Sequence, residues 1–111
     1  MNNKKVPQLI QSLLNQFNTK NFDLVISKGN ILLKKNPEYV ILYNLIGSAH
    51  QNQGNFDKAK TYFINGLKLD PNNIALMNNL AMSYKNLLQY ELAEELYLKI
   101  ISKNKEYVNA Y

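Results

Sequence analysis

The sequence of 111 residues contains no cysteine and no arginine. Without cysteine the chain has no disulfides, no thiolate metal sites and no cysteine nucleophile. Without arginine it lacks the bidentate fork that phosphate and base-edge recognition use most, so we do not expect it to bind nucleic acid. The net charge of +5 comes from thirteen lysines. Because these are spread along the chain, we expect a solvated surface rather than an anion-binding face.

Glycine and proline are also scarce, with four and three copies, so long elements with few tight turns are expected. Apolar residues make up 46% of the chain, enough for the packed interior of one domain. No stretch is long and apolar enough to span a membrane. Pro7, Gln8, Gln11 and Ser12 interrupt residues 6–14, so this stretch forms no apolar core of a signal peptide. We predict a cytoplasmic chain without a membrane partner.

The sequence repeats itself at an interval of 34 residues. Pro37 and Pro71 are separated by this interval, and a turn-forming residue, Asn36 or Asp70, precedes each proline. Aromatic, apolar and small residues keep the same interval: Phe22, Phe56 and Tyr90; Leu33, Leu67 and Ile101; Val25, Ala59 and Ala93; Gly47 and Ala81. One structural unit therefore occurs about three times.

Apolar residues within each period follow helical spacing, and no stretch alternates with a period of two. This pattern predicts two amphipathic helices per period, separated by a short Gly/Asn break, with a proline that opens the next helix from its first turn. The predicted helices span residues 7–18, 22–35, 38–53, 56–69, 72–87 and 90–103, with a seventh beginning near residue 106. Helices this short need neighbours for stability, so we expect a stack.

Residues 40–73 resemble a complete tetratricopeptide repeat. The residues that carry the resemblance are Tyr43, Ile46, Gly47, Gly54, Phe56, Ala59, Phe63 and Pro71. Residues 74–107 follow the pattern without the proline, and residues 6–39 follow it more loosely. The resemblance implies an all-α superhelix of three helical hairpins, plus the start of a fourth in the stub 108–111, within a single domain spanning residues 1–111.

The resemblance also implies a function. In this family the first helix of each hairpin lines a concave face, which makes the chain a scaffold for an extended peptide or partner protein. The partner-binding residues implied are Ile41, Asn44, Ser48, Gln51, Asn52, Asn78, Asn79, Met82, Lys85 and Asn86. In the first hairpin they are Pro7, Ile10, Leu14, Phe17 and Asn18. Amide side chains suit a peptide backbone because they both donate and accept hydrogen bonds. The alternative is a solvated surface in an asparagine-rich protein.

Two known forms of this concave face are similar to the sequence to different degrees. The clamp that binds acidic chaperone tails would place its lysines and asparagines at five positions, of which only Asn79 agrees: Ile10, Leu14, Leu45, Ala75 and Asn79. We therefore reject a clamp of that type. The asparagine ladder of protein O-glycosyltransferases would fall at Asn79 and Leu45, with Asn44 and Asn78 one residue earlier. This partial match favours sequence-tolerant peptide binding.

No constellation of residues predicts catalysis, a cofactor or a metal site. His50 has no carboxylate or cysteine near it in the sequence, so we expect it to pack between helices. Glu91, Glu94 and Glu95 are expected on a solvated face. We predict that the chain is not an enzyme. The alternative is the N-terminal repeat portion of a larger bacterial glycosyltransferase or sulfotransferase.

The C-terminal end of the predicted stack is apolar. Terminal repeats need a polar outer face, yet Tyr97, Ile100 and Ile101 would be left partly uncovered there. The sequence therefore predicts either a fragment of a longer array or self-association through this end. The looser first repeat suits an N-terminal cap.

Overall fold

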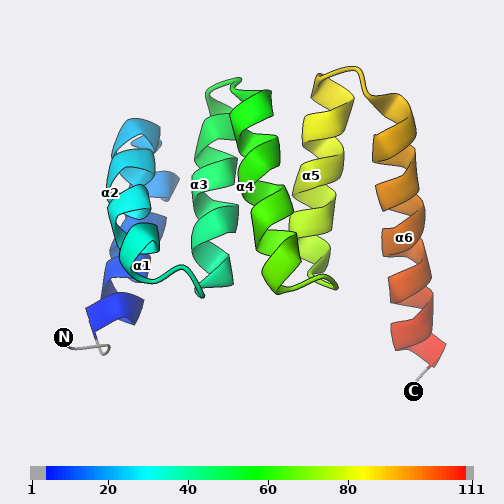
Figure 1. Cartoon of the computed structure of the whole chain (residues 1–111), viewed down its shortest axis with the longest axis horizontal. Coiled ribbons are helices and arrows are strands. Elements are labelled where there is room, and N and C mark those ends of the chain that lie inside the picture. Colours follow the sequence, from blue (N-terminus) through cyan, green and yellow to red (C-terminus); the bar gives the residue numbers. More distant parts are fainter. Residues whose placement is uncertain (1–4, 110–111) are drawn as a thin grey trace.

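The structure, a computed structural model, describes residues 5–109 of the chain and the side chains of residues 5–105. The described residues form six helices and no strand. The helices are α1 (Lys5–Asn18), α2 (Phe22–Lys35), α3 (Val40–Asn52), α4 (Phe56–Leu69), α5 (Ile74–Asn86) and α6 (Tyr90–Asn109). Successive helices run up and down beside one another (Figure 1). The predicted all-α helical stack is confirmed.

A close approach of two backbones joins α3 to α4 within the middle hairpin. A Cβ atom added to Gly47 would lie 2.5 Å from Cε1 of Phe63, a distance that real Cβ contacts do not reach. Phe63 and Ala59 are fully buried on the facing helix. Small residues at this contact therefore allow the aromatic ring to fill the hairpin interior.

The hairpins also pack on one another, because α2 contacts α3 and α4 contacts α5. The odd-numbered helices touch across the stack as well, α1 against α3 and α3 against α5. Among the described residues, the backbones of α2, α4 and α6 do not approach one another in this way, although a Tyr62–Asn30 hydrogen bond links α4 to α2. The stack therefore bends toward its odd-numbered helices, which line the concave side, while the even-numbered helices form the convex side.

The turns between hairpins differ from the prediction. α3 begins at Val40 and α5 at Ile74, two residues after the predicted starts at 38 and 72. The proline occupies the intervening turn, where the N–H of Tyr39 donates to the carbonyl of Asn36, and the N–H of Asn73 donates to that of Asp70. The expectation that the prolines open a helix from its first turn is wrong, because these turn hydrogen bonds place each proline before the helix.

The predicted seventh helix is absent from the described residues. α6 continues without interruption from Tyr90 to Asn109, past the expected break near residue 104. Lys105 stands where the other repeats have proline and keeps the N–H group that an uninterrupted helix requires. No fourth hairpin begins in residues 5–109, and residues 110–111 of the predicted stub lie outside the described part of the chain.

The turns inside the three hairpins share one backbone conformation. Lys20, Gly54 and Leu88 lie 34 residues apart and have φ angles of 65°, 80° and 63°. Only the middle hairpin places glycine at this left-handed position, where other L-residues are strained. The predicted Gly/Asn break is thus present in all three hairpins, although two of them use a less suitable residue.

Candidate functional site

The predicted partner-binding residues of the second and third hairpins lie on α3 and α5, two of the helices that line the concave side. Ile41 and Met82 are large apolar side chains that are about two-fifths exposed. The remaining positions are polar. Asn44, Ser48, Gln51 and Asn79 are half-buried, whereas Asn52, Asn78, Lys85 and Asn86 are exposed.

Hydrogen bonds join the polar side chains of α3 to those of α5. The Asn79 amide donates to Oδ1 of Asn44 over 2.6 Å, and the Ser83 hydroxyl donates to Oε1 of Gln51 over 2.9 Å. The Gln51 amide also lies 4.0 Å from the sulfur of Met82. This row, which we call the amide ladder, consists of Asn44, Asn79, Gln51 and Ser83. Asn44 and Asn78 are 34 residues apart and occupy equivalent positions of the repeat, which predicts that they stack, but the structure pairs Asn44 with Asn79.

The amide ladder retains unused hydrogen-bonding groups. Among the described residues the amide group of Asn44 has no acceptor, and Oδ1 of Asn79 has no donor. Both N–H donors of Asn44 and the acceptor oxygen of Asn79 therefore remain, and a peptide group needs one partner of each kind. Asn52 and Asn86 contribute less, since each amide group donates to its own helix, at the carbonyls of Ser48 and Met82.

The first hairpin does not extend this polar surface. Ile10 is buried, and Leu14 and Phe17 are half-buried against the core that α1, α2 and α3 share. The ring of Phe17 meets Phe22 edge-on at 5.3 Å. Burial takes Ile10 out of reach of a partner, whereas Leu14 and Phe17 keep part of their surface exposed, so their contact with a partner stays a prediction. Pro7 and Asn18 are exposed.

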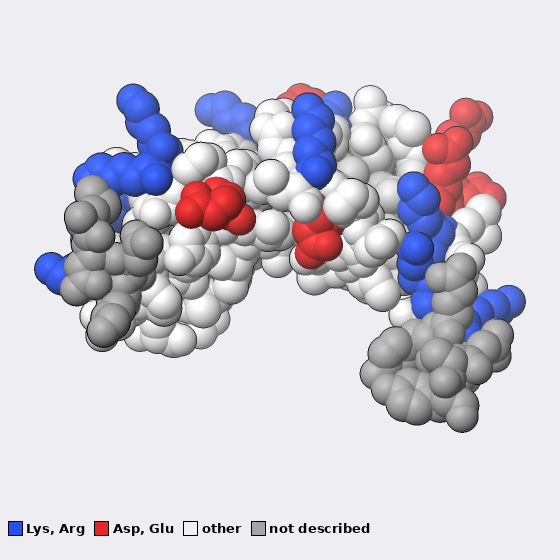
Figure 2. Space-filling view, turned by 60° about the horizontal axis from the view of Figure 1, so that its bottom comes forward, with Lys and Arg blue, Asp and Glu red and all other residues white. Residues whose placement is uncertain are grey.

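Charge is distributed very unequally between the two sides of the stack. The three concave helices contain two charged residues, Lys5 and Lys85, each close to a helix end. By contrast, α2 and α4 contain four each and α6 contains seven. In Figure 2 the lower, hollowed edge between the two ends is white, most lysines lie along the upper rim and at the ends, and two acidic groups lie on the face between them. The concave surface is polar but almost uncharged.

His50 packs on the convex side of α3, as the sequence predicts. It is only 7% exposed and stacks on Tyr62, with ring centroids 5.5 Å apart. The Tyr62 hydroxyl in turn donates to Oδ1 of Asn30 on α2 over 2.7 Å. Burial, and to a lesser extent the charge of Lys58, lowers the pKa of His50 below its ordinary value of 6.5. His50 is thus neutral near pH 7.

Two cavities lie away from the predicted site, and the sequence analysis missed both. A cavity of about 640 Å³ opens between α2 and α4 over α3, with His50, Tyr62 and Asn65 in its lining. Another, of about 570 Å³, lies between α1 and α2 and is mainly apolar with lysines at its edge. No motif marks either cavity, because each is lined by side chains of different helices and depends on how those helices pack.

The acidic residues of α6 do not form a catalytic pair. Glu91, Glu94 and Glu95 are all exposed, as expected. Glu95 affects one neighbour: burial and then its charge raise the pKa of Tyr84. Within the described residues no cluster of three or more histidine or acidic side chains could hold a metal ion. None of the described helices is long and apolar enough to cross a membrane.

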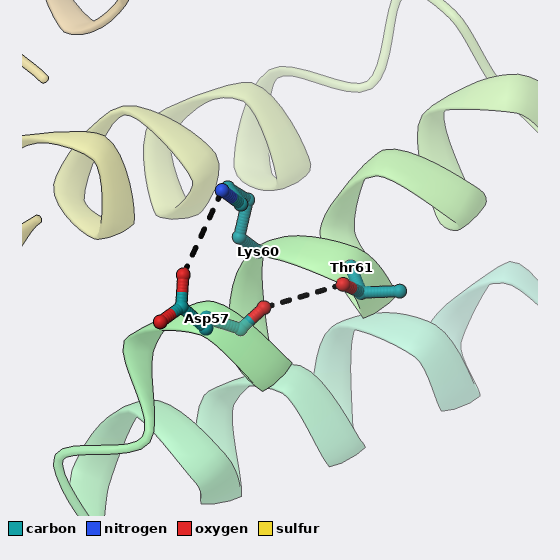
Figure 3. Close-up of polar contacts among 3 residues, drawn as sticks. All are labelled: Asp57, Lys60 and Thr61. Atoms are coloured by element: carbon teal, nitrogen blue, oxygen red, sulfur yellow. Dashed lines mark hydrogen bonds and ion pairs between the residues drawn. The ribbon is translucent and has the colours of Figure 1, made fainter.

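The first turn of α4 shows how the convex helices use their charges. Asp57 lies at the helix N-terminus, where a negative charge interacts favourably with the helix dipole. Its carboxylate is 3.7 Å from Nζ of Lys60, and its carbonyl accepts from the Thr61 hydroxyl (Figure 3). An exposed pair of this kind contributes little stability. We therefore assign it no binding role.

Comparison with known proteins identifies the repeat. Residues 40–73 and residues 74–110 each match a family model described as Tetratricopeptide repeat. The chain belongs to the tetratricopeptide repeat family. This family consists of protein-binding helical scaffolds, which agrees with the neutral, amide-lined concave side of the second and third hairpins.

Relatives of this tetratricopeptide repeat protein include a protein named ycf37 from Pyropia yezoensis. The two are 32% identical over 90 residues, which cover 80% of this chain and 47% of the relative. The human protein O-mannosyl-transferase TMTC3 is 36% identical over 66 residues, which cover 60% of this chain and 7% of the transferase. Because that match covers so little of the enzyme, it does not favour the alternative of an enzyme's N-terminal portion over a scaffold.

Solved structures with the same fold include the MamA protein. MamA of MSR-1 superposes with a TM-score of 0.83 at 23% identity, covering 91% of this chain and 58% of that one. MamA of AMB-1 gives a TM-score of 0.77 at 26% identity, covering 81% and 53%. The chain therefore spans about half the length of the ycf37 protein and of the MamA structures, and a much smaller part of TMTC3.

Proposed function

We propose that the concave side of α3 and α5 binds an extended, largely uncharged segment of a partner protein. The observation that carries this proposal is the amide ladder, which leaves the Asn44 amide group and Oδ1 of Asn79 available on a surface without carboxylates or arginine. An extended backbone offers one N–H and one C=O per residue, and both can pair with this amide surface. Such a contact tolerates many partner sequences.

The exposed apolar side chains on the same face add a limited preference. Ile41 and Met82 flank the polar row and present apolar surface to a bound chain. A thioether adapts its shape to different neighbours, so Met82 suits a surface that accepts several apolar side chains. The preferred partner segment is therefore extended and neutral. It has an apolar side chain on either side of the peptide group that bonds to Asn44 and Asn79.

Capture experiments with three forms of the chain test this proposal. Wild type, Asn44→Ala/Asn79→Ala and the convex control Asn65→Ala are immobilised and compared for the proteins that each one retains. Proteins retained by wild type and Asn65→Ala but lost by the double variant support the concave site. Retention should also persist at about 0.5 M salt, because no ion pairs carry the contact. An identical set on all three forms would refute the proposal.

We also propose that the chain does not catalyse a reaction and that it acts in the cytoplasm. In addition, we propose that it associates with itself through α6. The first part is supported by the tetratricopeptide repeat matches, which cover residues 40–110. Self-association is supported by Leu98 and Ile101, which are at least half exposed on α6. Sedimentation of the chain at increasing concentration tests it, and a constant monomer mass would refute it.

A further inference from the structure

One row of apolar side chains on α6 is equivalent to the row on α4 that packs against the following hairpin. On α4 the corresponding apolar residues are Ile64 and Leu67, which are half-buried against the core that includes Leu76 and Leu80 of α5. Their counterparts one period later are Leu98 and Ile101, which are 58% and 50% exposed. The face that buries a neighbour in the middle of the stack is open on α6.

The open stripe has oppositely charged ends. Glu94, Leu98, Ile101 and Lys105 follow one another at intervals of four, three and four residues, so they share one side of the helix. All four are exposed. Intervals of three and four are those of a coiled-coil seam. The apolar centre of the seam is therefore flanked by an acid toward the start of α6 and a base toward its end.

We propose that this stripe pairs with the same stripe of a second copy of the chain, with the two α6 helices antiparallel about a two-fold axis. This pairing rests on the self-association proposed above. It specifies which surface of α6 is involved and which residues of the two copies meet. With the axis midway between Leu98 and Ile101, each Leu98 meets the partner's Ile101. The same register places each Glu94 beside the partner's Lys105. The stripe is thus self-complementary in both shape and charge.

Parallel pairing lacks this complementarity. In that arrangement the two Glu94 side chains would meet each other and the two Lys105 side chains would do the same, which is unfavourable. The charges therefore select the antiparallel arrangement. The seam is short, so we expect a weak dimer that forms only at high protein concentration.

Charge exchange tests the register directly. Glu94→Lys and Lys105→Glu each create two like-charge contacts in an antiparallel dimer, and each should weaken dimerisation about tenfold or more. The double variant Glu94→Lys/Lys105→Glu should restore it. An equimolar mixture of the two single variants should also dimerise, because every contact between unlike copies is then complementary. Sedimentation equilibrium over about 10 µM to 1 mM measures all four.

Matched controls lie next to the stripe on the same helix. Glu95→Lys and Lys99→Glu make the same charge changes at exposed positions outside the stripe, where both side chains line a small cavity between α5 and α6. They should leave the dimer unchanged. Circular dichroism melts of all variants should match the wild type, since each substituted side chain is exposed.

The possible outcomes separate the register from the self-association on which it rests. The proposed pairing is supported if both single variants lose dimerisation and if the double variant and the mixture of single variants regain it. A wild-type dimer that the single variants leave intact, or that the controls weaken equally, overturns the register and keeps self-association. A wild-type monomer throughout overturns both, and is the result expected if a further hairpin of a longer chain covers α6. None of these outcomes bears on the concave site.

Discussion

The ring of Phe63 lies directly against the backbone of Gly47, so close that even a methyl group at residue 47 would overlap it. Gly47→Ala should therefore destabilise the chain by about 1–3 kcal/mol, because the buried ring cannot move without disturbing its neighbours. Urea unfolding followed by circular dichroism measures the change. Ala81→Gly is the comparison, since it gives the third hairpin the residue of the second. An unchanged unfolding midpoint for Gly47→Ala would contradict the close contact.

The left-handed turn positions predict opposite effects for two substitutions. Gly54→Ala should lower stability by about 1 kcal/mol, although an added Cβ would meet no neighbour there, because its φ of 80° strains an L-residue. Leu88→Gly should raise stability by up to about 1 kcal/mol, since Leu88 is 70% exposed and adopts φ of 63°. Thermal melts of both variants test these two predictions. If both substitutions shifted the melting temperature in the same direction, the two turns would differ in conformation.

The start of α5 is held by a side-chain cap. Oδ1 of Asn73 accepts the N–H of Leu76 over 2.9 Å, whereas Asn55 makes no such bond at the start of α4. Asn73→Ala should therefore cost about 1 kcal/mol, and Asn55→Ala should cost clearly less. Denaturant unfolding of the two variants under one set of conditions gives the comparison. Equal losses would mean that the Asn73 bond contributes nothing.

His50 makes stability depend on pH in a definite direction. Burial and Lys58 hold its pKa in the folded chain below the value of 6.5 expected after unfolding. The unfolded chain therefore binds the proton more readily, so this contribution to stability is complete above about pH 6.5 and is lost as the pH falls toward the folded pKa. His50→Tyr, which copies Tyr84 of the next repeat, should remove it. Melts between about pH 8 and about pH 5 should then show wild type losing more stability than the variant.

The sequence predicted the stack well because its strongest signals are repeated. Phe56, Ala59 and Phe63 recur with equivalents in neighbouring periods, so the pairing of helices could be inferred from spacing alone. The helix starts at Val40 and Ile74 were placed two residues early. Turn hydrogen bonds after Pro37 and Pro71 decide these starts, and their geometry is not visible in the residue types. The repeat boundaries at residues 6–39 and the single domain of residues 1–111 stay predictions.

The candidate site was predicted less completely. Placing Asn44 and Asn79 on one face required only helical periodicity, but their mutual hydrogen bond depends on the offset between α3 and α5. That offset is a property of the packed stack, so the sequence suggested Asn78 as the partner instead. The burial of Ile10 was missed for a related reason: the position that is exposed on the concave side in the second hairpin is part of the hydrophobic core in the first.

A photo-crosslinking amino acid placed at single positions tests the central claim most directly. The exposed concave residue Asn78 and the convex residue Asn65 each receive the probe in turn, and irradiation follows incubation with proteins that the wild-type chain captures. The concave binding surface predicts crosslinks to the captured proteins from position 78 and none from position 65. Crosslinks from position 65 alone would contradict it.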